Sequence, residues 1–265
     1  MRSLLVFVPV LIPLAVFATG GVSNYSEWRA NYEASLKAPD GWLSVAGLSW
    51  LHEGANTIEL PAGASQKTVG LNLAGGKVTY EKRHLKSDVT DHPDVLKFGS
   101  VTLTIIDRNG KMGVRLRDPK AETRRDFAGC TWFPASAAWD IKAKWVAYPK
   151  PKNIAIVNIL GMMDQEPSPG YAEFTLRGKT LRLEPVLDDG ELFFMFRDTT
   201  SAHTTYGAGR FLYASVPKGN EVELDFNKAH NPPCAFTAFA TCPLPPKQNI
   251  LAVAIEAGEK TYGHH

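Results

Sequence analysis

The sequence predicts an all-β protein with one short helix near its N-terminus, on three observations. From Trp42 onward the apolar residues fall into short runs rich in β-branched and aromatic types, and turn residues separate these runs. No segment of helix length with a helical period lies between them, so the crossovers of a parallel sheet are missing. We therefore expect a mostly antiparallel meander that closes into a barrel or a two-sheet sandwich.

The short amphipathic helix is predicted over residues 25–37. A capping box with Asn in place of Ser starts it over residues 24–27, and Pro39-Asp40-Gly41 ends it. Large side chains recur every four residues along it, as one face of a helix requires: Trp28, Tyr32 and Leu36.

The clearest β-hairpin is SVTLTIIDRNGKMGVRLRD, in which Asn109-Gly110 supplies the positive φ angles of a tight turn. Three further hairpins are predicted by the same rule, with turns at Gly178-Lys179, Asp189-Gly190 and Lys218-Gly219-Asn220. No repeat or linker divides the chain, and we expect a single domain over residues 19–265. A boundary between two β halves near residues 148–152 is the alternative, although a surface loop explains that stretch as well.

Residues 1–18 have the pattern of an export signal. Arg2 precedes an apolar run that ends at Phe17, and compact residues lie at the positions that a signal peptidase recognises before its cleavage site. A permanent membrane anchor is the less favoured alternative, because the run is short and Pro9 and Pro13 interrupt it. We expect a mature protein that starts near Thr19, has no stable membrane anchor and is secreted or periplasmic.

Composition and motifs exclude several functions. The formal net charge of +2 is small, and basic and acidic residues are interspersed, which argues against a nucleic-acid partner. The sequence contains no G-x-S-x-G elbow, H-E-x-x-H motif, P-loop or G-x-G-x-x-G loop.

The three cysteines are interpreted for an oxidising compartment. Cys234 and Cys242 are a disulfide candidate that leaves Cys130 odd. A metal site that uses His230 with these two cysteines is a less favoured alternative, because the spacing matches no familiar zinc or copper pattern. We therefore expect no metal and no cofactor.

The first concentration of polar residues is FRDTTSAHTTYGAGRFLYA, residues 196–214, between two expected strands. In one interpretation, which residue types alone favour, Asp198 pairs with Arg210 in a well hydrogen-bonded connection. In the other, Arg210 holds a carboxylate or phosphate while Tyr206 or Asp198 transfers protons. Thr199 and Thr204 are further candidate binding residues of this loop.

A second concentration follows the last expected strand, in LDFNKAHNPPCAFTAFATCPLPPKQN. Asp225 is a candidate acid or base, and Pro232-Pro233 stiffen the chain beyond it. The candidate binding residues here are Asn227, His230 and Asn231.

A third set, Arg115 and Arg117, lies on one side of a strand by the two-residue alternation. Paired guanidinium groups cradle an anion if that side lines a cavity, and otherwise form a charged outer face.

These residues lie in blocks that resemble the family filed as domain of unknown function 1684: WLSVAGLSWLHEGANTI, GVRLRD, the 196–214 loop, and the block from Leu224 to Lys260. The resemblance covers the mature chain and implies no particular reaction. It implies that two sets of residues are typical of the family: Asp198, Thr199, Thr204, Tyr206, Gly207 and Arg210, and then Asp225, Asn227, Asn231, Pro232, Cys234, Cys242, Glu256 and Lys260. It also implies that His203 and His230 are less typical, which weakens both as obligatory catalysts.

Two functions from different classes follow as hypotheses. The first is a secreted or periplasmic enzyme, a hydrolase of a small or polymer-derived substrate with an anionic or carbonyl group. Its catalytic candidates are Asp198, Tyr206, Asp225 and Glu256, with Arg210 on the substrate oxygen. The second is a non-catalytic barrel or sandwich that binds a small apolar or anionic ligand among aromatic side chains. It predicts a deep cavity lined by Trp and Phe and no convergent acid–base pair. Buried, mutually satisfied Asp198–Arg210 and Asp225–Lys260 pairs away from any cavity would favour this hypothesis or a purely structural role. The oligomeric state is left open.

Overall fold

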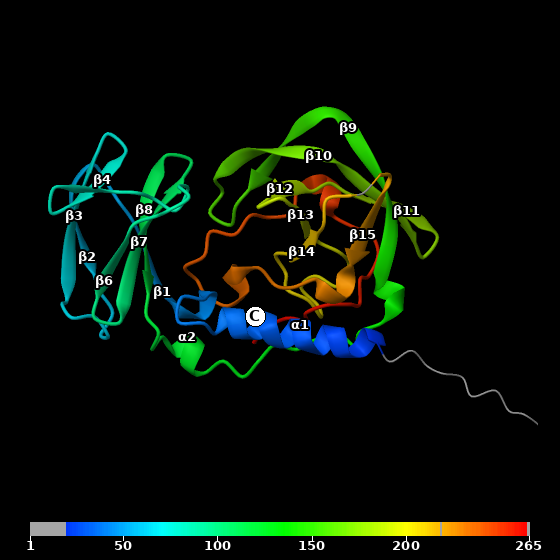
Figure 1. The fold of residues 1–265 in the computed structure, drawn as a ribbon, viewed down its shortest axis with the longest axis horizontal. Coiled ribbons are helices and arrows are strands. Elements are labelled where there is room, and N and C mark those ends of the chain that lie inside the picture. The colour runs from blue at the N-terminus through cyan, green and yellow to red at the C-terminus, as the bar shows by residue number, and fades with distance from the viewer. Residues whose placement is uncertain (1–19, 218, 264–265) are drawn as a thin grey trace, which may run out of the picture.

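The computed structural model describes residues 20–217 and 219–263, so the predicted export signal and the predicted start near Thr19 lie outside the described residues. Two β-rich lobes lie side by side, and helix α1 (Gly20–Leu36) runs along the second of them (Figure 1). The all-β prediction with a short N-terminal helix is confirmed, and every pairing between the named strands is antiparallel.

The first lobe is a sandwich of two four-stranded sheets, ordered β1-β8-β7-β6 and β2-β3-β4-β5. Leu71 and Val78 of one sheet and Leu103 and Val114 of the other belong to the apolar cluster between them. The strands are β1 (Val45–Trp50), β2 (Gly54–Glu59), β3 (Thr68–Ala74), β4 (Lys77–Tyr80), β5 (Arg83–Leu85), β6 (Val95–Phe98), β7 (Val101–Arg108) and β8 (Lys111–Arg117). The short helix α2 (Glu122–Arg125) follows.

The second lobe has a curled four-stranded sheet, β11-β10-β9-β15, and a three-stranded sheet, β12-β13-β14. Its largest apolar cluster joins residues from both sheets, including Trp145, Phe174, Phe194 and Phe226. The strands are β9 (Asp140–Val157), β10 (Met163–Leu176), β11 (Lys179–Leu183), β12 (Val186–Asp188), β13 (Glu191–Phe196), β14 (Arg210–Ala214) and β15 (Glu221–Asp225). Strand β9 runs through residues 148–152, so these residues form a strand and not a surface loop.

Three of the four predicted hairpins are confirmed. Strands β7 and β8 meet around Asn109 and Gly110, whose φ angles are 56° and 81°. Strands β12 and β13 meet around Asp189-Gly190. Strands β10 and β11 also form a hairpin, although Leu176 pairs with Lys179, so its turn lies one residue earlier than predicted.

The fourth predicted hairpin is wrong. Strand β14 pairs with β13, whereas β15 pairs with β9 in the other sheet. The connection over residues 215–220 is longer than a tight hairpin turn, and this length lets the chain cross between the sheets. There Val222 and Leu224 of β15 join the main core of the second lobe.

Helix α1 begins five residues before the predicted start. No proline lies between Gly20 and Asn24, and a capping pattern alone sets a helix boundary only weakly. The predicted large side chains do share one face, because the rings of Trp28 and Tyr32 stack with centroids 5.6 Å apart and Leu36 is buried. None of the helices within the described residues has the length and apolar character needed to span a membrane.

The two lobes and the C-terminal loops contact one another through a small set of polar bonds. Asn109 Nδ2 of the first lobe donates to Met163 O of the second at 3.2 Å, and Thr237 Oγ1 of the C-terminal loop donates to Val45 O. Arg108, at the end of β7, donates from Nε to Thr241 Oγ1 at 3.0 Å. The loop over residues 226–263 therefore lies against both lobes and against α1, and it closes a cavity at their junction.

Candidate functional site

Asp198 and Arg210 form a buried ion pair. Arg210 Nη2 donates to Asp198 Oδ2 at 2.7 Å, and the two side chains are 1% and 0% exposed. The guanidinium also donates to the carbonyl oxygens of Ile255 and Ala257. Asp198 Oδ1 in turn accepts from the backbone and hydroxyl of Thr200. The Asp198 carboxylate is thus satisfied by the fold, and Arg210 keeps only Nε without a partner among the described residues. Neither residue lines the junction cavity described below.

The other residues of the 196–214 loop point in different directions. Tyr206 is half-buried and donates from its hydroxyl to Cys234 O, and burial raises the pKa of this hydroxyl well above its usual value. Thr199 and Thr204 are exposed, and their backbones bond to Val253 and Thr261. The loop therefore does not gather its predicted donors and acceptors around one point.

Three further predicted residues lie outside the 196–214 loop and have partners of their own: Asp225, Asn227 and Glu256. The predicted Asp225–Lys260 pair is wrong, because Asp225 pairs with Lys228 at 3.1 Å and Lys260 Nζ lies over the ring of Phe133. Asp225 also accepts from Asn227 Nδ2 at 2.9 Å. Asn227 also bridges to the backbone of Ser136, so it fastens two loops together. Glu256 lies on the surface in an ion pair with Arg177. The catalytic roles of Asp225 and Glu256 and the binding role of Asn227 stay predictions. None of the three lines the junction cavity described below, although Asp225 and His230 both line a second cavity of about 690 Å³.

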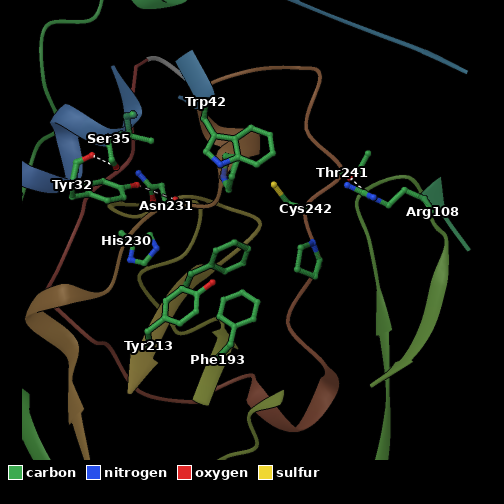
Figure 2. Close-up of a pocket in the computed structure, with 14 residues that line it drawn as sticks. Tyr32, Ser35, Trp42, Arg108, Phe193, Tyr213, His230, Asn231, Thr241 and Cys242 are labelled. Atoms are coloured by element: carbon green, nitrogen blue, oxygen red, sulfur yellow. Dashed lines mark hydrogen bonds between the residues drawn. The ribbon is translucent and has the colours of Figure 1, made fainter. Parts of the chain in front are cut away.

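A cavity of about 490 Å³ lies at the junction of the lobes, and Figure 2 shows it. Helix α1, the end of β7, strands β13 and β14 and the loop over residues 230–243 all contribute to its wall. The residues that line it are Tyr32, Ser35, Leu36, Trp42, Arg108, Phe193, Phe211, Tyr213, His230, Asn231, Pro233, Thr241, Cys242 and Pro243.

The aromatic wall of this cavity follows from strand alternation. Phe193 and Tyr213 are register partners on β13 and β14, and their rings stack at 4.7 Å. Phe211, two residues before Tyr213, therefore points to the same face and meets Phe193 edge to face at 4.7 Å. The ring of His230 stacks on Tyr213 at 6.1 Å. These four rings brace one another and leave little freedom for the wall to collapse.

His230 and Asn231 are the predicted binding residues that the structure brings to this cavity. His230 Nδ1 lies 3.0 Å from Lys228 O; a carbonyl only accepts, so Nδ1 carries the proton and Nε2 stays an acceptor. Burial lowers the pKa of His230 from 6.5 to about 4, which keeps the ring neutral near pH 7. Asn231 presents a buried Oδ1 that has no partner among the described residues.

Glu259 was not among the residues predicted from the sequence, and it is fully buried directly behind the cavity wall. Its Oε2 accepts from Asn231 N–H at 2.7 Å and from the hydroxyl of Tyr32 at 3.3 Å. Burial raises the pKa of Glu259 from 4.5 to about 7. No motif marks this residue, and the resemblance favoured Glu256, three positions earlier.

Arg115 and Arg117 do share one side of their strand, as predicted, because both guanidinium groups lie over the ring of Trp42, at 5.0 and 6.0 Å. Trp42 lines the cavity, whereas the arginines lie behind it. Arg115 is only 6% exposed.

The three cysteines are free thiols in this structure. Cys242 Sγ accepts from Cys234 N–H at 3.1 Å, and the two thiols lie within hydrogen-bonding reach of each other. The disulfide between them stays a prediction. Cys130 contacts Glu259, and burial raises the pKa of its thiol. Over residues 20–217 and 219–263, no group of three His, Cys, Asp or Glu residues is arranged to hold a metal ion.

Comparison with known proteins places the second lobe in a family. The family described as "Protein of unknown function (DUF1684)" matches residues 125–260. The chain belongs to this family. A solution NMR structure of an uncharacterized protein from Haloarcula marismortui is similar, with 29% sequence identity over 54% of this chain and 81% of that chain and a TM-score of 0.45. No curated protein matches the chain.

The family match has a consequence for the cavity. Strands β13 and β14 and the loop over residues 230–243 lie inside the matched range, and they carry the aromatic wall and His230. Helix α1, Trp42 and Arg108 come from the part of the chain before residue 125. The cavity is thus assembled from the family's segment and from this chain's first lobe and helix.

Proposed function

We propose that the protein binds a small, largely apolar molecule, with room for an aromatic ring system, in the junction cavity. The observation that carries the proposal is the aromatic wall of Phe193, Phe211 and Tyr213, together with Trp42, around about 490 Å³ of space. Ligand sites are concave, mostly apolar and lined by a few placed polar groups, and 490 Å³ lies in their usual range of roughly 300–1,000 Å³. Here His230 Nε2 is an acceptor available to orient a ligand, and Asn231 Oδ1 is buried in the wall beside it without a partner among the described residues.

The arrangement of the predicted acid–base residues supports binding over hydrolysis. Asp198 and Arg210 satisfy each other away from the cavity, and Glu256 pairs at the surface. This is the pattern expected of the non-catalytic alternative, in which signature charges maintain the fold. The predicted secretion or periplasmic location belongs to the same proposal, with a small molecule as partner.

A substitution at the cavity rim tests the proposal. Ser35 is exposed on α1 and lines the cavity, whereas the adjacent Ala34 is exposed and does not. In the variant Ser35→Phe we expect the added ring to occupy the cavity and to weaken binding of the neutral fluorophore N-phenyl-1-naphthylamine at least about tenfold. The measurement is a fluorescence titration of the purified protein.

The matched control is Ala34→Phe, which adds the same ring on the neighbouring position and should leave the affinity unchanged. Equal affinities of both variants and the wild type would place the fluorophore elsewhere and contradict the proposal. Absence of binding to the wild type would count against it equally.

A hydrolase or other acid–base enzyme is the second candidate, and one observation favours it. Tyr32 lines the cavity and donates to Glu259, whose pKa of about 7 suits proton transfer near neutral pH. A screen of ester, phosphate and glycoside substrates tests this candidate. If the protein is such an enzyme, the wild type is active on one of these substrates, and Tyr32→Phe abolishes that activity while the fold remains intact.

A further inference from the structure

We propose that the junction cavity takes ligands that carry an acidic group, a carboxylate or a sulfonate, and that the arginines at its first-lobe edge bind this group. The inference rests on the proposed function and adds the ligand's charge to it. Arg108 is the contact residue, and Arg115 supplies charge from behind the wall. In Figure 2 Arg108 and Thr241 lie across the cavity from Tyr32 and His230, so the cationic edge faces the aromatic and histidine wall.

Arg108 has one donor to spare. A guanidinium has five N–H groups. Four of them donate to Asp88 Oδ1 at 3.0 Å, Asp88 Oδ2 at 2.7 Å, Asp107 O at 2.6 Å and Thr241 Oγ1 at 3.0 Å. One N–H of Nη2 is left without a partner among the described residues. Because these bonds hold the group in place at the cavity wall, the spare donor is already ordered for an acceptor.

Arg115 is a buried cation with little compensation. Its Nε and Nη2 atoms are buried and have no hydrogen-bond partner among the described residues. Its closest carboxylate oxygen, Asp88 Oδ2, lies 3.8 Å from Nη1 and is already bonded to Arg108. A buried guanidinium ordinarily has its donors satisfied, since an unpaired donor is costly. Arg115 also lies within electrostatic reach of Cys242, which lines the cavity.

The local balance of charge is therefore positive. Arg108, Arg115 and Arg117 gather around Asp88 and Trp42, and Asp88 is the carboxylate that pairs with the first two. Asp40 and, to a lesser degree, Asp88 act electrostatically on Arg117. In a partly buried site this excess is weakly screened, so an anion there is stabilised.

The acidic group is expected on the aromatic side of Arg108. Arg108 also borders an adjoining, smaller cavity of about 280 Å³, whose wall carries Asp164, Glu166 and Asp188. These carboxylates repel an anion, and burial and Asp164 raise the pKa of Glu166. The junction cavity has no Asp or Glu in its lining. An acidic ligand with an aromatic body therefore fits the junction cavity with its charge at Arg108 and its rings against Phe193 and Phe211.

A matched pair of probes tests the inference. 8-Anilino-1-naphthalenesulfonate and N-phenyl-1-naphthylamine share one ring system and differ by the sulfonate. We expect the wild type to bind the sulfonate more tightly at low salt and the preference to shrink with added salt. Arg115→Met, which keeps a long side chain without charge, should weaken sulfonate binding about tenfold and leave the neutral probe unchanged.

The control is Arg83→Met, a substitution of an exposed arginine in the same lobe that pairs with Asp94 and should change neither affinity. If Arg115→Met does not fold, the ratio of the two affinities in the wild type and its salt dependence still decide. Equal binding of both probes, or sulfonate binding that Arg115→Met leaves intact, overturns the charge inference while the proposed function stands. Binding of neither probe overturns the proposed function itself.

Discussion

The variant Arg210→Met is expected to lose about 3–5 kcal/mol of the free energy of unfolding, because it leaves the Asp198 carboxylate buried without its counter-charge. The substitution also removes the donors to the carbonyl oxygens of Ile255 and Ala257, so three acceptors lose their partner together. Gly209 adds to the constraint: its φ is 105°, and a Cβ there would lie 2.6 Å from Phe196 O. Urea unfolding of both proteins measures the loss.

Arg177→Met is the matched control. Arg177 likewise pairs with a carboxylate, that of Glu256, but both side chains of this pair are more than half exposed. Its loss should stay below about 1 kcal/mol. A second substitution, Asp198→Leu, placed on Arg210→Met should recover part of the lost stability, because no charge is then left buried. A loss in Arg210→Met no larger than that of the control would show that the ion pair does not maintain the fold.

Glu259 is expected to make the stability of the folded protein fall as pH rises from about 4.5 to about 7. Burial raises its pKa in the folded state from 4.5 to about 7, so over that range the folded state holds a proton that the unfolded chain has released. Stability is thus fully present below pH 4.5 and is lost as pH rises through 7. The difference corresponds to about 3 kcal/mol. The measurement is the free energy of unfolding of the wild type and of Glu259→Gln at each pH from 4 to 8, and the difference between the two is compared.

His230 supplies the comparison, because burial shifts its pKa the opposite way, from 6.5 to about 4. Its neutral folded form contributes stability above pH 6.5 that is lost as pH falls through 4. The difference in free energy of unfolding between wild type and His230→Gln should therefore rise with pH. The same difference for Glu259→Gln should fall over that pH range. Two flat profiles, or two profiles of the same sign, would mean that these groups are not buried as the structure has them.

The local elements could be predicted because their signals are local. Asn109-Gly110 and Asp189-Gly190 tolerate positive φ angles, and alternating side chains on either side fix the register of each hairpin. The pairing of β15 with β9 could not be predicted in the same way. A strand joined by a longer connection chooses its partner by which apolar surface it covers, and Val222 and Leu224 fit the core of the other sheet.

The candidate site divides along the same line. His230 and Asn231 were predicted to bind because a proline pair stiffens their loop, and they do line the cavity. Asp198 and Arg210 were candidates because of their residue types. Residue type alone does not distinguish a charged pair that binds a ligand from one whose members bind each other. Tyr32, Trp42 and Arg108 come from three separate elements, and no spacing in the sequence relates them to Phe193 or Tyr213.

The sequence by itself determined that this protein is an antiparallel β fold with an N-terminal helix, that Arg115 and Arg117 share a strand face, and where most tight turns fall. Only the tertiary structure decided that Asp198 and Arg210 are buried together, that Glu259 lies behind Tyr32, and that aromatic rings and arginines meet at one cavity. The physical reason is the sequence range over which each interaction acts. Turn and alternation preferences act over a few residues, whereas burial, charge compensation and cavity shape depend on chain segments that meet only after the two lobes and α1 have packed.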